Sequence, residues 1–163
     1  MNILYFQNMK FRFYQLMYVA SLVLTVMALL SPVVGFTEAD GGVAQMTNFK
    51  YTAPDGSVSS SVVALGILLI FTAVVNFLGL VLSLYNNFEM QKRVTILTML
   101  LFAGYYILFF VYTLVLSDDA SMAIEVSMLY PFISLTLNLI AFLLLRRCEA
   151  KIIAKALGFR LRD

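Results

Sequence analysis

Few residues in this 163-residue chain are of a type that can do chemistry. There is no histidine and only one cysteine, Cys148, which excludes haem ligation, Ser-His and Cys-His nucleophiles, cysteine clusters and internal disulfides. The strongest polar groups inside the long apolar segments are Asn76 and Asn138, with Tyr105 and Tyr112. Neutral amides and phenols hydrogen-bond across helices, whereas pumps and proton-coupled transporters use ionisable groups at depth. We therefore expect no catalytic residue, no metal site and no cofactor.

Small and polar residues recur in the apolar segments at alternating steps of three and four. This is the seam period of a left-handed helical bundle, and small residues there allow helices to approach closely. Helix packing is the favoured interpretation, and a polar pocket for a ligand or a lipid headgroup is the alternative. Tyr105 and Tyr112 lie on the corresponding face of the third segment, where their hydroxyls are expected to bond Asn or Ser. The other members are Thr72, Asn76, Gly79, Ser83, Ser134 and Asn138, with Ser21 and Thr25 in the first segment.

The composition requires a membrane environment for these segments. Hydrophobic residues make up 62% of the chain and charged residues 12%, against about 25% charged in a soluble domain. We predict an all-α membrane protein, a four-transmembrane-helix bundle with up-down-up-down topology, in one domain spanning 1–163. Each span is free of charge and near the length that a bilayer requires. The spans are 13–36, 61–85, 94–116 and 128–145, with outer loops 37–60 and 117–127, a cytoplasmic loop 86–93 and a tail 146–163.

The charges orient these spans. Lys and Arg in short loops stay in the cytoplasm, and every basic residue except Lys50 falls in the N-terminus, the 86–93 loop or the tail. Both termini are therefore predicted to be cytoplasmic. The basic set either only orients the protein or also contacts anionic lipid headgroups at the cytoplasmic face. Its candidate membrane-surface members are Lys92, Arg93, Arg146, Arg147, Lys151, Lys155, Arg160 and Arg162.

The segments outside the membrane are small. Pro54, Asp55 and Gly56 give a turn signal in the first outer loop, which predicts a small hairpin lying on the helix ends or against a partner. The acidic 117–127 loop is expected to be solvated, with weak cation binding as the alternative. The tail is predicted to form an amphipathic helix that lies on the membrane or continues the fourth span. Cys148 is expected to be a reduced thiol. Residues 1–8 look partly like a protease-tag remnant, so we expect the native start at Met9.

Three stretches resemble the small four-span membrane proteins of Bacteroidota grouped as domain of unknown function 4293. They are MKFRFYQLMYVAS at the start, LSLYNNFEMQKRVTIL between the second and third spans, and LLLRRCEAKIIAKALGFRLRD at the end. Cys148 and the Gly158-Phe159 pair depart from the more polar run of the family. The resemblance implies a bacterial inner membrane protein with both ends inside, and it implies no reaction. The matching residues are Asn86 or Asn87, Lys92, Arg93, Arg146, Glu149, Arg160 and Arg162.

These observations favour a non-enzymatic accessory or scaffold subunit of an envelope complex. Its partners would be the lipid bilayer and another membrane protein or further copies of the chain, and no nucleic acid is expected. The alternative is a small oligomeric transporter, channel or lipid-binding protein with a neutral polar lining formed by Asn76, Asn138, Tyr105 and Tyr112. An enzyme is the least favoured class, because it would have to work with Asn, Ser, Tyr and interfacial charges.

Overall fold

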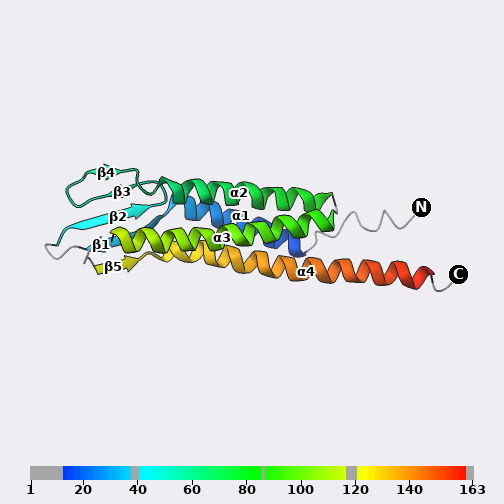
Figure 1. Ribbon diagram of the computed structural model, residues 1–163. Helices are drawn as coiled ribbons and strands as arrows, with labels where there is room; N and C mark the ends of the chain where they lie inside the picture. The colour runs from blue at the N-terminus through cyan, green and yellow to red at the C-terminus, as the bar shows by residue number, and fades with distance from the viewer. Residues whose placement is uncertain (1–12, 38–40, 86, 117–120, 161–163) are drawn as a thin grey trace.

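The computed structural model describes residues 13–37, 41–85, 87–116 and 121–160. The chain is mostly helical, and four helices are long and apolar enough to cross a membrane. They lie side by side, and the strands gather at one end of them (Figure 1). The helices are α1 (Phe13–Leu30), α2 (Val63–Leu84), α3 (Phe88–Leu116) and α4 (Leu129–Arg160), and the strands are β1 (Pro32–Thr37), β2 (Val43–Thr47), β3 (Tyr51–Thr52), β4 (Val58–Ser59) and β5 (Ser121–Ile124).

Each helix packs mainly against two others. α1 contacts α4 and α2, and α3 contacts α2 and α4, so the four contacts close a ring. The residues that repeat at steps of three and four face this interior. Exposed apolar residues such as Val74, Phe77 and Ile107 cover the outside. An outer surface this apolar is typical of helices surrounded by lipid.

The first helix is shorter than the predicted span over 13–36. α1 ends at Leu30, and residues 32–37 form strand β1. Pro32 explains the break, because it disfavours a helical conformation at Ser31 and cannot donate a helical hydrogen bond. Ser31 instead donates from its Oγ to the carbonyl of Met27, at 2.9 Å. The sequence stays apolar beyond the end of α1 because most of β1 is also buried in the protein.

The predicted hairpin is part of a larger sheet. Residues 51–59 do form a hairpin, in which β3 and β4 flank the predicted turn and Gly56 takes a positive φ of 82°. Hydrogen bonds from the side chain and from the backbone amide of Ser57 lower the pKa of the Asp55 carboxyl, and the amide lies 2.8 Å from Oδ1. The antiparallel sheet has five strands in the order β4-β3-β2-β1-β5.

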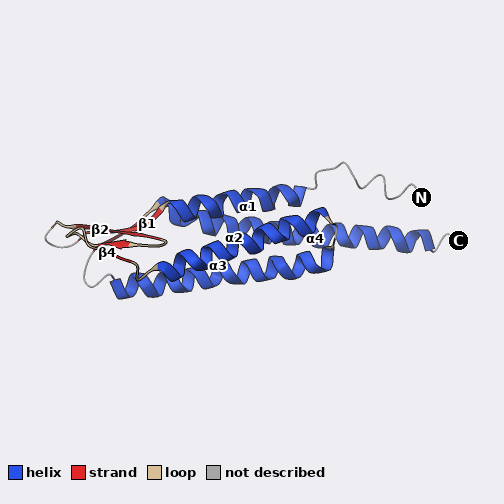
Figure 2. Cartoon of the chain, turned by 90° about the horizontal axis from the view of Figure 1, so that it is seen from above, coloured by secondary structure: helices blue, strands red, loops and turns tan. Residues whose placement is uncertain are grey.

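The outermost strand comes from the other outer loop. β5 pairs with β1, with Val34 opposite Ile124, so part of the 117–127 loop is an edge strand, and the side chains of residues 122–126 are exposed as predicted. A single 3₁₀ turn, η2 (Val126–Met128), links β5 to α4. Asp118 and Asp119, the acids considered for weak cation binding, lie outside the described residues. Figure 2 shows the strands together at one end of the helices.

The segments at the opposite end are more helical than predicted. α3 begins at Phe88, not at Val94, and Asn87 starts it by accepting a hydrogen bond from the Met90 amide to its Oδ1, at 3.2 Å. The expected 86–93 loop therefore shrinks to a short turn. α4 continues without a break to Arg160, so the tail is not a separate amphipathic helix. Its last turns extend past the ends of the other three helices (Figure 1).

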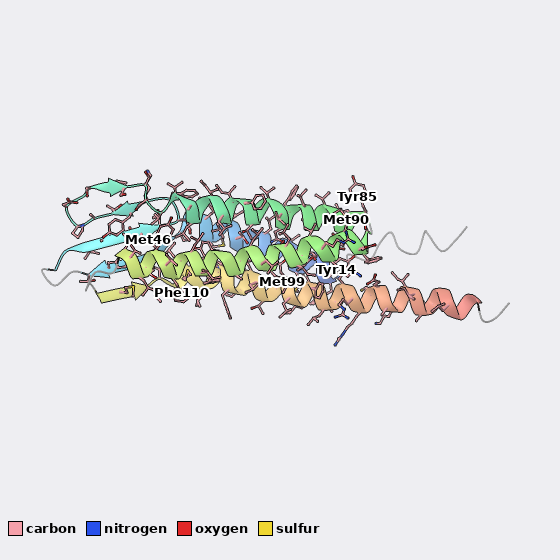
Figure 3. The ribbon with its side chains drawn as sticks, viewed as in Figure 1. Tyr14, Met46, Tyr85, Met90, Met99 and Phe110 are labelled. Carbon is pink, nitrogen blue, oxygen red and sulfur yellow. The ribbon has the colours of Figure 1, made fainter. Side chains whose placement is uncertain are left out.

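The sheet and the helix ends share one hydrophobic core. Val34, Phe36 and Met46 from the strands pack with Leu65 of α2 and Phe102 of α3, and all five are almost completely buried. Figure 3 places Met46 in the sheet, Phe110 near the sheet end of α3, and Tyr85 and Met90 at the opposite end. The sheet thus covers one end of the helices.

Candidate functional site

A cluster of polar side chains lies between α1, α2 and α4. Ser21 Oγ accepts hydrogen bonds from Asn76 Nδ2 at 2.9 Å and from Asn138 Nδ2 at 2.6 Å. Ser134 Oγ donates to the Ser21 carbonyl at 3.0 Å, and Thr25 Oγ1 donates to that carbonyl at 2.7 Å. All five side chains are buried. We call these residues the polar seam, and they connect three helices directly.

The other small residues of the second segment are also buried. Thr72 Oγ1 donates to the Leu68 carbonyl at 2.8 Å and Ser83 Oγ to the Leu80 carbonyl at 2.6 Å, so both satisfy their hydroxyls within their own helix. Gly79 faces the ring of Tyr18, since a Cβ there would lie 3.5 Å from the nearest ring carbon. These positions serve the close approach of α1 and α2.

Neither Tyr105 nor Tyr112 forms a hydrogen bond with the polar seam in the described part of the chain. Tyr105 is buried and its hydroxyl donates to Asn48 Oδ1, at 2.7 Å. The expectation that it bonds an asparagine is right, but this asparagine comes from the outer loop and not from a span. Tyr112 is half-buried and packs beside the hydrophobic core. The structure therefore does not bring Tyr105 and Tyr112 together with Asn76 and Asn138 through hydrogen bonds that it describes.

Asn48, which the sequence analysis did not single out, connects the sheet to two helices by hydrogen bonds. It lies in the turn between β2 and β3, is fully buried, and donates from Nδ2 to the Ala28 carbonyl at the end of α1, at 2.7 Å. Its neighbour Phe49 lies against Gly66 of α2, where an added Cβ would be 2.2 Å from a ring carbon. This close approach requires glycine at position 66. The sequence feature that could have indicated the Asn48 contact is an asparagine followed by an aromatic residue between two strands.

Except for Lys50, which lies in the turn between β2 and β3, the described basic residues lie at the end away from the sheet. Lys92 Nζ bonds both carboxylate oxygens of Glu149, at 3.0 and 2.8 Å, and so connects α3 to α4. Arg93 pairs with Glu89 one turn earlier on the same helix, at 2.7 Å. The remaining described basic side chains are exposed on α4: Arg146, Arg147, Lys151 and Lys155. Arg160 ends the helix with its side chain outside the description, and Arg162 lies outside the described residues, as does Asn86.

Some buried polar atoms have no partner in the described part of the chain. They are Asn76 Oδ1, Asn138 Oδ1, and both Oε1 and Nε2 of Gln91. Gln91 lies in the first turns of α3 and was not predicted as a site residue. Buried acceptors without partners in proteins often bond an ordered water.

A groove of about 400 Å³ opens beside the sheet, where α3, α4 and the β5-η2 segment meet. Its walls are almost entirely apolar, and Glu125 is the one charged residue that lines it. Phe110 and Phe132 line the groove and are 58% and 57% exposed. Other lining residues are Tyr106, Val126 and Met128.

The titratable residues suggest no further centre. Among the described residues, no three His, Cys, Asp or Glu side chains come close enough to hold a metal ion. Cys148 is half-buried beside Tyr14 and Leu145, between α1 and α4. The site residues with defined contacts are therefore those of the polar seam, the Asn48 contact, the Lys92 pair and the groove.

One family model matches the chain. Its description is Domain of unknown function (DUF4293), and the match covers residues 13–152, from the start of α1 to the part of α4 that follows the Lys92 ion pair. No curated protein matches the sequence.

Proposed function

The chain belongs to the DUF4293 family, and from this premise and the contacts described above we propose that it is a non-enzymatic accessory or scaffold subunit of a complex in a bacterial inner membrane. The four helices cross the bilayer up and down in turn. The sheet lies on the outer side, and the protruding end of α4 lies in the cytoplasm. There this end docks another membrane-associated protein.

The charge distribution supports this orientation. The described basic side chains other than Lys50 lie at the end away from the sheet, and the outer segments hold Glu38, Asp40, Asp55, Asp118, Asp119 and Glu125. Basic loops are retained in the cytoplasm during insertion. The sheet, which carries its described acids Asp55 and Glu125, then faces outward.

The polar seam is the observation that carries the scaffold proposal. Its amides and hydroxyls bond one another across three helices at 2.6 to 3.0 Å in the shortest contacts. Each such interhelical bond is worth about 0.6 to 2 kcal/mol in a membrane. Side chains engaged in this way fix the helices relative to one another. A rigid support with small extramembrane parts is what a scaffold subunit requires.

The end of α4 provides the docking element. After the Lys92–Glu149 ion pair the helix continues from Ala150 to Arg160, which is about 16 Å at 1.5 Å per residue. Lys151 and Lys155 lie one turn apart and are exposed, and Leu157 is also exposed. A helix with exposed basic and apolar side chains suits a partner with acidic and apolar surface. Where the helix leaves the bilayer, Arg146 and Arg147 are placed to contact anionic lipid headgroups.

A photo-crosslinking amino acid at position 157 tests the docking element in cells. The matched control carries the same amino acid at Phe71, an exposed apolar position on α2. We expect one discrete protein adduct at position 157, reduced several-fold by Lys151→Gln/Lys155→Gln and unaffected by Arg93→Gln. An adduct at twice the mass of the chain would identify the partner as a second copy. Lipid adducts alone at both positions would contradict the proposal.

The unpartnered Oδ1 atoms of Asn76 and Asn138 favour a second candidate function. Two buried acceptors in the middle of the helices are groups that a small neutral solute or water would bond. The chain would then be a small oligomeric transporter or channel, with Tyr105 and Tyr112 toward its outer end. Flux of water or glycerol into liposomes, compared between the unaltered protein and Asn76→Leu/Asn138→Leu, tests this. Equal flux for both proteins and empty liposomes would reject it.

A further inference from the structure

The groove beside the sheet has the chemistry of a lipid site, and its position along the helices supports this. It is bounded by Tyr106 of α3, whose hydroxyl donates to the Met128 carbonyl at 2.9 Å, and by the first turn of α4. This is the level at which α1 and α2 also end, so it is the boundary between the apolar bundle and the sheet. In a bilayer, glycerol and headgroup atoms lie at such a boundary and acyl chains lie below it.

The size of the groove favours a hydrocarbon chain over a helix of another protein. Its volume of about 400 Å³ falls within the range of about 300 to 1,000 Å³ that is usual for small-molecule sites. One turn of helix, about 10 Å across and 5.4 Å long, would alone occupy about 400 Å³. The groove volume therefore matches only about one turn of a partner helix, whereas a flexible acyl chain can follow its length between Phe110 and Phe132.

The charge at the groove selects the headgroup. Glu125 is exposed at the groove, its backbone amide is fixed by a bond to the Val33 carbonyl at 3.1 Å, and neither ion pair in the described part of the chain includes it. The same outer loop carries Asp118 and Asp119 in the sequence. Negative charge at a membrane surface attracts cations and repels anions. A phosphatidylglycerol headgroup is therefore disfavoured, and a headgroup with a primary ammonium is favoured.

We infer that the groove between α3, α4 and the β5-η2 segment binds an aminophospholipid of the outer leaflet, phosphatidylethanolamine being the simplest. Its acyl chain lies between Phe110 and Phe132, and its ammonium group pairs with Glu125. The inference uses the proposed orientation only to choose the leaflet, and it holds whether or not the cytoplasmic end of α4 docks a partner.

The absence of tryptophan from the sequence makes this inference directly measurable. Phe132→Trp places one fluorophore in the groove, and Ile67→Trp places one on α2 at a similar distance from the sheet, where the side chain is 60% exposed. Both variants are reconstituted in phosphatidylcholine vesicles with increasing amounts of phosphatidylethanolamine brominated on its acyl chains. Bromine quenches a nearby tryptophan. We expect half-maximal quenching of the groove tryptophan at a several-fold lower brominated fraction than for the control.

Three results would overturn the inference. Identical quenching curves for the two tryptophans would mean that the groove holds only bulk lipid. Equal quenching by brominated phosphatidylethanolamine and brominated phosphatidylcholine would remove the headgroup preference. Protection of the groove tryptophan from every brominated lipid would mean that a protein segment fills the groove.

A second measurement uses the unaltered protein and so does not depend on tryptophan being tolerated. Native mass spectrometry from mixed micelles is expected to retain phosphatidylethanolamine in several-fold excess over phosphatidylglycerol, and Glu125→Gln is expected to abolish the excess. Asp55→Gln is the matched control, because it removes one acidic charge from the sheet at a distance from the groove. Equal retention in the unaltered protein and in Glu125→Gln would contradict the pairing with the carboxylate.

Discussion

Replacing Asn48 with alanine tests how the sheet is held on the helices. The amide donates to the Ala28 carbonyl and accepts from the Tyr105 hydroxyl, each at 2.7 Å, and all three groups belong to different elements. Asn48→Ala leaves the buried Tyr105 hydroxyl without its acceptor, and the Ala28 carbonyl keeps only the longer bond from the Ser31 amide, at 3.4 Å. An orphaned buried group costs about 1 to 3 kcal/mol and the lost bond to the carbonyl about 1 kcal/mol more, so we expect a loss of roughly 2 to 4 kcal/mol in the free energy of unfolding.

A double-mutant cycle separates this contact from general damage. Tyr105→Phe alone leaves Asn48 Oδ1 unpaired and is expected to cost about 1 to 2 kcal/mol. In the Asn48→Ala background the same change removes a hydroxyl that is already orphaned, so it is expected to cost almost nothing. The coupling energy is then about 1 to 2 kcal/mol, within the range for residues that share a bond.

The assay is unfolding in mixed micelles by added dodecyl sulfate, followed by circular dichroism, together with hydrogen exchange of residues 43–52. Gln45→Ala, an exposed change on the adjacent strand β2, serves as control and is expected to stay within about 0.5 kcal/mol of the unaltered protein. If the effects of Asn48→Ala and Tyr105→Phe on the free energy of unfolding are additive to within about 0.5 kcal/mol, the hydrogen bond does not hold the sheet and the reasoning is refuted.

Four further predictions follow from single contacts. Gly66→Ala is expected to destabilise the protein by about 1 to 3 kcal/mol through overpacking and to speed hydrogen exchange in residues 43–52, and unchanged exchange would contradict the contact. Ser21→Ala removes the acceptor of two amide donors and should lower the free energy of unfolding in dodecyl sulfate by roughly 1 to 3 kcal/mol. An unchanged unfolding midpoint would contradict a stabilising role of the polar seam. Lys92→Gln should cost at most about 1 kcal/mol, because the side chains of Lys92 and Glu149 are 27% and 29% exposed, and the difference from the unaltered protein should shrink in high salt. The pKa of Asp55 is lowered in the folded turn, so the stability that its carboxylate adds is present above the pKa of the unfolded chain and is lost as the pH falls through the pKa of the folded chain. An NMR titration of this carboxyl should give a pKa below 3.8.

Much of the helical part could be predicted from the sequence. Long charge-free runs bounded by charged residues indicate spans, and steps of three and four placed Asn76 and Asn138 on buried faces. The error at the end of the first span has a local cause. A buried strand is as apolar as a helix, so hydropathy alone does not separate Pro32–Thr37 from α1, and only the proline marks the boundary.

The sheet could not be predicted in full because its pairing is long-range. β1 and β5 lie in different outer loops, and Val34 meets Ile124 only because α1 and α4 are neighbours. The 3.6-residue and two-residue patterns in a sequence describe single elements and carry no information on which loops meet. The partner of Tyr105 was misplaced for the same reason, since Asn48 reaches it from the loop.

The order of the strands also sets the order in which this protein can be completed during synthesis. The strands β1 to β4 leave the ribosome before α2, whereas β5 follows α3 and directly precedes α4. Until β5 is made, β1 therefore has one unpaired edge, although both of its edges are paired in the finished sheet. Unpaired strand edges are the surfaces to which other chains readily add. A chain that ends before β5 thus exposes an edge of β1 that the finished protein covers.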